Sequence, residues 1–231
     1  MPDPIAARLA DVRARIARAA GRAGRDPASV SLVAVSKTFP ADSVRAAAAA
    51  GQIDFGENKV QEALRKMDET SGLPIRWHLV GHLQSNKAKK AAARFDVIHS
   101  VDSADLIARI DEGAEGRRVD LLVQVDIAGE ATKFGASEEE LLGIFEAGAR
   151  ANSARIVGLM LIPPAVADPE DARPYFRQLK GVRDWLLARG VDAAALQHLS
   201  MGMSHDFEAA IEEGATLVRV GTAIFGSRAY P

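Results

Sequence analysis

The feature that most constrains this chain is a regular alternation of short apolar runs with longer segments of helical character. Amphipathic segments such as KVQEALRKMDE and SEEELLGIFEAGARA separate the runs, and several of them are closed by glycine. Runs that are rich in Val, Ile and Leu and are joined by helices predict a parallel sheet that is covered on both faces. Eight such runs occur in the 231 residues: SLVAVSK, QIDFGEN, RWHLVGH, DVIHSVD, DLLVQVDI, RIVGLMLIP, ALQHLSMG and LVRVGTAIFG.

Eight strand-helix units without a Gly/Pro/Ser-rich linker predict a single (β/α)8 TIM barrel domain over residues 1–231. A doubly wound open sheet is the alternative. No G-x-G-x-x-G follows the first strand, where a dinucleotide-binding sheet would place one. An extra N-terminal helix is expected before the first strand, with Asp3 as its N-cap and Pro4 at its first position. Its apolar residues recur every three or four positions, at Ile5, Leu9, Val12 and Ile16.

Charge and composition exclude several classes of partner. A formal net charge of -2 gives no broad attraction for nucleic acid or for anionic membranes. No segment approaches the roughly 20 apolar residues of a membrane span. The chain has no cysteine, which suits a reducing cytoplasm and excludes a cysteine metal site. His78 and His82 lack the pattern of a zinc motif and are expected to be core histidines, so we expect no metal site.

Lys37 lies where the first apolar run ends, in the stretch LVAVSKTFP. Functional side chains of such barrels lie at the C-terminal ends of the strands. The lysine is either a solvated side chain or a desolvated amine that forms a Schiff base. A lysine acts as a nucleophile only when it is neutral, which requires burial among apolar side chains. Its position behind Val33 and Val35 favours the Schiff-base interpretation.

Small hydroxyl residues and glycines follow the last two predicted strands, where many barrels bind phosphate. The segment HLSMGMSHDFEAAI supplies Ser200 and a helix expected to begin near Ser204, and VRVGTAIFG supplies Gly221 and Thr222. Either segment alone could be an ordinary turn. Their joint presence after strands seven and eight favours a phosphate site.

Arg219 is expected to point into the barrel, because a period of two from Gly221 places it on the inner face of the last strand. An arginine cannot deprotonate, so beside a heterocyclic nitrogen it would donate a hydrogen bond and keep that nitrogen unprotonated. An ion pair with a barrel acid such as Asp126 or Glu57 is the alternative. A lysine, a phosphate site and an arginine together match the aldehyde, phosphate and ring nitrogen of pyridoxal 5'-phosphate (PLP).

Six segments resemble those of the YggS/PROSC-type family of PLP-binding homeostasis proteins: AVSKTFP, FGENKVQE, WHLVGHLQSNK, GLMLIPP, HLSMGMSHDFEAAI and VRVGTAIFG. The resemblance implies a barrel similar to the N-terminal domain of alanine racemase, with PLP held as an internal aldimine. It also implies seven cofactor-binding residues: Lys37 for the aldimine, Arg219 for the ring nitrogen, Asn58 and Met160 near the ring, and Ser200, Gly221 and Thr222 for the phosphate.

The sequence offers little for efficient catalysis. A racemase of this kind needs a second base, and the two tyrosines lie in a predicted helix (Tyr175) and next to the chain end (Tyr230). We therefore expect a cytoplasmic, monomeric carrier that holds PLP for intracellular homeostasis and passes it to PLP-dependent apo-enzymes, with no efficient catalytic activity. A low-activity amino-acid racemase and a Schiff-base aldolase without cofactor remain the alternatives.

Overall fold

Eight parallel strands close into a barrel in the order in which they occur along the chain. The computed structural model describes residues 4–127 and 135–226. Each strand pairs with the next, and the first pairs with the last, so the barrel prediction is confirmed and the open sheet is wrong. The strands are β1 (Ser31–Val35), β2 (Asp54–Glu57), β3 (Arg76–Leu79), β4 (Val97–Val101), β5 (Val119–Gln124), β6 (Ala154–Met160), β7 (His198–Ser200) and β8 (Leu217–Val220).

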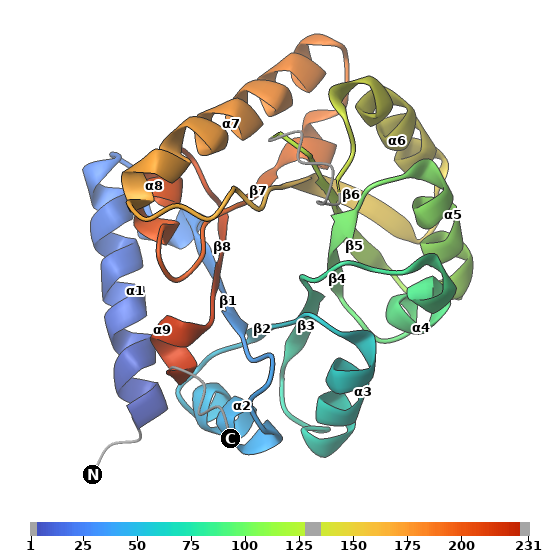
Figure 1. Cartoon of the computed structure of the whole chain (residues 1–231). Coiled ribbons are helices and arrows are strands. Elements are labelled where there is room, and N and C mark those ends of the chain that lie inside the picture. Colours follow the sequence, from blue (N-terminus) through green and yellow to red (C-terminus); the bar gives the residue numbers. More distant parts are fainter. Residues whose placement is uncertain (1–3, 128–134, 227–231) are drawn as a thin grey trace.

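Helices surround the ring of strands, as Figure 1 shows. The described residues also contain short 3-10 turns: η1 (Pro27–Ser29), η2 (Ser85–Lys87), η3 (Pro169–Ala172) and η4 (Ala193–Leu196). The α-helices are α1 (Pro4–Arg22), α2 (Ala41–Ala49), α3 (Val60–Glu69), α4 (Ala88–Ala92), α5 (Ala104–Gly113), α6 (Glu138–Arg150), α7 (Arg173–Ala188), α8 (Phe207–Glu212) and α9 (Thr222–Phe225). Among the described residues, no helix has the length and apolar character needed to cross a membrane.

Several helix starts are specified locally. Ser103 accepts a hydrogen bond from Leu106 N at the start of α5. At the start of α6, Glu140 Oε2 accepts hydrogen bonds from Ser137 N (2.9 Å) and from Ser137 Oγ (2.8 Å). The helix expected near Ser204 begins only at Phe207, because Asp206 accepts a hydrogen bond from Met203 N and residues 204–206 form a turn.

The extra N-terminal helix is confirmed as α1. Leu9 and Val12 are fully buried and Ile16 is 5% exposed, and the helix packs against α2, α8 and α9. In Figure 1 it runs along the outside of the barrel beside α8 and α9. The expected N-cap, Asp3, lies outside the described residues.

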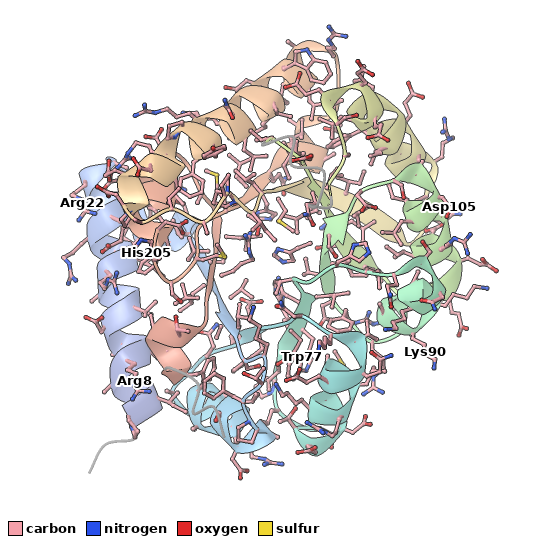
Figure 2. All side chains as sticks on the ribbon, viewed as in Figure 1. Arg8, Arg22, Trp77, Lys90, Asp105 and His205 are labelled. Atoms are coloured by element: carbon pink, nitrogen blue, oxygen red, sulfur yellow. The ribbon has the colours of Figure 1, made fainter. Side chains whose placement is uncertain are left out.

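The core has two layers, which follow from the alternation of side chains along each strand. The outer layer lies between the sheet and the helices. The inner layer fills the barrel, so the ring of strands encloses packed side chains and not a channel (Figure 2). Its apolar members are Val33, Val35, Val80, Val97, Leu122, Val157, Met160 and Leu217.

Candidate functional site

A pocket of about 320 Å³ opens at the C-terminal ends of the strands. Its size falls within the range of small-molecule binding sites. A larger cavity of about 560 Å³ lies elsewhere, outside the barrel between α6 and η4, and contains none of the predicted site residues. Five of the seven predicted cofactor-binding residues line the pocket at the strand ends: Lys37, Asn58, Arg219, Gly221 and Thr222.

Lys37 follows β1 on the inner side of the barrel. Val33 and Val35 belong to the inner layer, so a period of two places Lys37 next in line, and its side chain is half-buried at the pocket. The next residue, Thr38, has a φ of 69°, which is strained for a β-branched side chain. Glu62 of α3 holds this turn by accepting a hydrogen bond of 2.6 Å from Thr38 N. The backbone around the lysine is therefore fixed from outside the barrel.

A buried lysine on α3 completes this support. Lys66 is 1% exposed, and its Nζ donates to Ser36 O and to Glu57 Oε1 (2.7 Å each) and to Glu62 Oε1 (2.9 Å). Ser36 Oγ donates to the same Glu57 oxygen at 2.6 Å. Both neighbours of Lys37 are thus tied to one ion-pair network, which we call the Lys66 network (Ser36, Glu57, Glu62 and Lys66).

The electrostatics of the Lys66 network depend on burial. Burial raises the pKa of Glu57, and the hydrogen bonds from Lys66 and Ser36 offset only part of this effect. Glu57 Oε2 has no hydrogen-bond partner among the described residues. The sequence contains a signal for Lys66 that the sequence analysis missed: it shares the buried face of α3 with Val60 and Met67.

Arg219 points into the barrel, as predicted, and is 5% exposed. Its Nη1 donates to Ser200 O (2.8 Å) and Ser200 Oγ (2.6 Å), and its Nη2 donates to Leu161 O (2.8 Å). These acceptors are uncharged oxygens, and the carboxylate of Glu57 instead binds Lys66 on the outer side of the sheet. Burial lowers the pKa of Arg219 to about 10, so the guanidinium stays charged at neutral pH.

The far end of the pocket is built by the loops after β7 and β8. Ser204 Oγ accepts hydrogen bonds from Gly221 N (3.1 Å) and Ala223 N (3.4 Å), which ties the two loops together. Gly202 has a φ of 92°, and a Cβ there would lie 2.6 Å from the Cβ of Ala210, so only glycine fits. Ser204 lines the pocket beside Thr222. It was treated only as a helix start in the sequence analysis.

Ser200 and Met160 do not line the pocket. Ser200 is fully buried, and its hydroxyl is bound by Arg219 and lies 2.9 Å from His99 Nδ1. Met160 is also fully buried, in the inner layer that contains the pocket residues Val35 and Val80. Both residues therefore support the pocket from within the barrel, and a contact of Ser200 with a phosphate remains a prediction.

The remaining histidines behave differently from one another. His78 is 1% exposed and hydrogen-bonded, as expected of a core histidine. The same expectation is wrong for His82, which lies beyond the end of β3 and is exposed. His205 lines the pocket, and its Nε2 lies 3.0 Å from Ala167 O, which joins the loop before α8 to the loop after β6. Within residues 4–127 and 135–226, no group of three or more His, Asp or Glu side chains could hold a metal ion.

Comparison with known proteins places the chain in a family. The family described as alanine racemase, N-terminal domain, matches residues 8–229. The chain belongs to this family. The pyridoxal phosphate homeostasis protein of Aquifex aeolicus is 44% identical over 225 residues, which are 96% of this chain and 98% of that protein. The resemblance that was drawn from the six sequence segments is thereby confirmed.

Solved structures of other proteins share the fold. The PipY protein of Synechococcus elongatus, solved with PLP bound, has a TM-score of 0.84 at 41% identity, covering 96% of this chain and all of that chain. Alanine racemase from Corynebacterium glutamicum has a TM-score of 0.71 at 17% identity, covering 98% of this chain and 62% of that one. The second likeness concerns the fold alone, and it agrees with the predicted similarity to the N-terminal domain of alanine racemase.

Proposed function

We propose that the chain binds PLP in the pocket at the strand ends and serves PLP homeostasis. The observation that carries this proposal is the joint placement of Lys37, Arg219, Ser204 and Thr222 around one pocket. An amine, a fixed cation and two hydroxyls match the aldehyde, the ring nitrogen and the phosphate of PLP. The PLP bound to PipY and the name of the Aquifex aeolicus relative support the same ligand.

Each pocket residue has a role in this proposal. The Nζ of Lys37 bonds to the aldehyde carbon of PLP to form a Schiff base, and the aldehyde oxygen leaves as water. Arg219 donates a hydrogen bond to the ring nitrogen, and Asn58 lies beside the ring. Thr222 and Ser204 bind the phosphate through their hydroxyls, and Gly221, whose N–H donates to Ser204 Oγ, lines the phosphate site between the two loops. Ser200 and Met160 act from within the barrel, where Ser200 holds Arg219 and Met160 packs in the inner layer.

We propose a monomeric, cytoplasmic carrier, which passes PLP to apo-enzymes, in preference to a racemase. Among the described residues, the pocket is lined by no carboxylate and no phenol that could serve as a second base, and the Nε2 of its histidine, His205, lies 3.0 Å from Ala167 O. Tyr175 lies on α7 and packs against the outer core, and Tyr230 lies outside the described residues. Assays with D- and L-amino acids test this choice. Sustained turnover at enzyme-like rates would favour the racemase alternative.

Titration of the purified protein with PLP tests the binding itself. We expect saturable binding with one PLP per chain and an absorption band that differs from that of free PLP, because a Schiff base replaces the conjugated C=O of the aldehyde by a C=N that can be protonated. The readout is the absorption spectrum together with equilibrium dialysis. A protein whose spectrum is the sum of the separate spectra, with no PLP retained, would contradict the proposed function.

The phosphate assignment predicts that Thr222→Val weakens PLP binding while the fold is retained. The substitution keeps the shape of the side chain and removes a hydroxyl at the pocket. Loss of one hydrogen bond to a charged group costs about 1.5 to 3 kcal/mol, or roughly 10- to 150-fold in affinity. Thr216→Val is the control, since Thr216 precedes β8 at the opposite end of the strand, where its hydroxyl accepts from Leu199 N. Equal affinities of the two variants would show that Thr222 is not a phosphate ligand.

A further inference from the structure

A chain of hydrogen bonds crosses the barrel interior from Arg219, at the pocket, to Asp54, at the start of β2. Arg219 Nη1 donates to Ser200 Oγ at 2.6 Å. Ser200 Oγ lies 2.9 Å from His99 Nδ1, and His99 Nε2 lies 2.9 Å from His78 Nδ1. His78 Nε2 lies 3.0 Å from Asp54 Oδ1. The five side chains come from five different strands, so only the closed barrel brings them together.

The middle of this hydrogen-bond chain is closed to solvent, and its two ends are not. His99 and Ser200 are fully buried and His78 is 1% exposed. The side chain of Asp54 is 20% exposed and lines a separate cavity of about 300 Å³ near the N-terminal ends of β1 and β2. Arg219 lines the pocket at the opposite ends of the strands. The hydrogen-bond chain therefore connects the two faces of the barrel.

The two ends of the chain fix the direction of every hydrogen bond in it. A guanidinium only donates, and a carboxylate only accepts. The four hydrogen bonds need four protons, and one arrangement supplies them while both histidines are neutral. In this arrangement Arg219 donates to the Ser200 hydroxyl, and that hydroxyl donates to His99 Nδ1. His99 then donates from Nε2 to His78 Nδ1, and His78 donates from Nε2 to Asp54. If both neutral histidines instead carried their proton on Nδ1, the lone pair of His78 Nε2 would face the carboxylate of Asp54, and no proton would lie between them.

The charges along the chain agree with this arrangement. Burial holds the pKa of His99 well below its usual value, and the positive charge of the nearby Arg219 acts in the same direction, so His99 is neutral at physiological pH. Burial alone would raise the pKa of Asp54. The hydrogen bond from His78 and the positive charge of Arg76 lower it, and the pKa of Asp54 lies below its usual value. Asp54 is therefore an acceptor at neutral pH.

We propose that Ser200, His99, His78 and Asp54 are positioning residues that hold Arg219 in a fixed orientation at the pocket. Both protons of Nη1 are used by Ser200, and one proton of Nη2 is used by Leu161. Among the described residues, the second Nη2 proton and the Nε proton have no protein acceptor, which leaves them for a ligand. The identification of this ligand as PLP rests on the function proposed above. The hydrogen-bond chain is observed in the structure and does not depend on that function.

The proton arrangement is tested on the full chain without cofactor. Long-range ¹H–¹⁵N spectra of histidine-labelled protein distinguish the two neutral tautomers and the imidazolium. We expect His78 and His99 to be Nε2–H tautomers at neutral pH. Asp54→Asn should introduce Nδ1–H signals, because an amide can also donate and so permits the reversed arrangement. An Nδ1–H or doubly protonated His78 or His99 in the parent protein would overturn the proposal.

A matched substitution separates the hydrogen-bond chain from a general charge effect. Asp120 lies near the start of β5 and pairs with Arg118 and Arg155, so Asp120→Asn makes the same charge change outside the chain. We expect its histidine tautomers to remain those of the parent. Equal responses of Asp54→Asn and Asp120→Asn would overturn the proposal.

The positioning role is tested on PLP-loaded protein. At neutral pH, the ratio of the PLP absorption bands should change in Asp54→Asn and Ser200→Ala and stay unchanged in Asp120→Asn, because only the first two release Arg219. If Ser200→Ala does not fold, Asp54→Asn alone tests the positioning role. An unchanged ratio of the absorption bands in Asp54→Asn would overturn that role. A parent protein that binds no PLP would instead refute the proposed function. The histidine tautomers would then still test the proposed direction of the hydrogen bonds.

Discussion

Replacing Lys37 with alanine is expected to abolish the borohydride-stable attachment of PLP to the protein. Lys37 is the lysine at the pocket, and the strained turn after it is fixed by Glu62. Borohydride reduces a Schiff base to a secondary amine, which survives denaturation and digestion. In the parent protein, mass spectrometry should find one modified peptide, and that peptide should contain Lys37. In Lys37→Ala, the modified peptide should be missing while weaker, reversible binding of PLP persists through the phosphate loops.

Two further variants define the role of the amine. Lys59 is an exposed lysine next to the pocket residue Asn58, so Lys59→Ala should be labelled as strongly as the parent. Lys37→Arg keeps a positive charge at the pocket, but a guanidinium does not deprotonate at neutral pH and cannot form the Schiff base. It should therefore resemble Lys37→Ala. Undiminished labelling of either Lys37 variant would mean that the Schiff base forms elsewhere.

The barrel was predictable from sequence because its determinants are local. Apolar runs that alternate with amphipathic helices already specify a buried parallel sheet, and the capping serines and glycines mark many of the helix ends. The position of Lys37, Asn58, Gly221 and Thr222 at the pocket was predictable, because these residues follow their strands directly and the C-terminal ends of the strands meet at one face of such a barrel. The start of α8 was misplaced, because the turn before it depends on the hydrogen bond from Met203 N to Asp206.

The supporting residues could not be predicted, because their roles depend on contacts between distant strands. His78, His99 and Ser200 come from three strands, and nothing in any one segment indicates that their side chains meet. The same holds for Ser204, which acts by joining two loops. Lys66 is an intermediate case. Its place on the apolar face of α3 shows that it is buried, but its partner Glu57 was considered only as a partner for Arg219.

Lys66→Met is expected to lower the free energy of unfolding by about 3 to 5 kcal/mol, the usual effect of breaking a buried ion pair. Methionine keeps most of the apolar volume of the lysine, so the loss comes mainly from Glu57, whose carboxylate stays fully buried without its cation. Lys89→Met is the control. Lys89 pairs with Glu112 on the surface, both side chains are more than 60% exposed, and an exposed pair contributes about 0 to 1 kcal/mol. Urea unfolding at neutral pH measures both variants.

The pH dependence distinguishes a stranded carboxylate from a simple loss of packing. The pKa of Glu57 is raised in the folded protein, so the cost of burying this acid is absent below its unfolded pKa of about 4.3 and grows as the pH rises through the folded pKa. The pKa of Glu62 is lowered in the folded protein, in part by its hydrogen bond to Lys66, so the stability that this bond adds is also lost as the pH falls. The difference between Lys66→Met and the parent should therefore be small near pH 4 and widen toward neutral pH. Adding Glu57→Gln to Lys66→Met should recover part of the loss at neutral pH, because it removes the ionisable group. A deficit that is constant with pH would show instead that packing, and not the buried charge, is what Lys66 contributes.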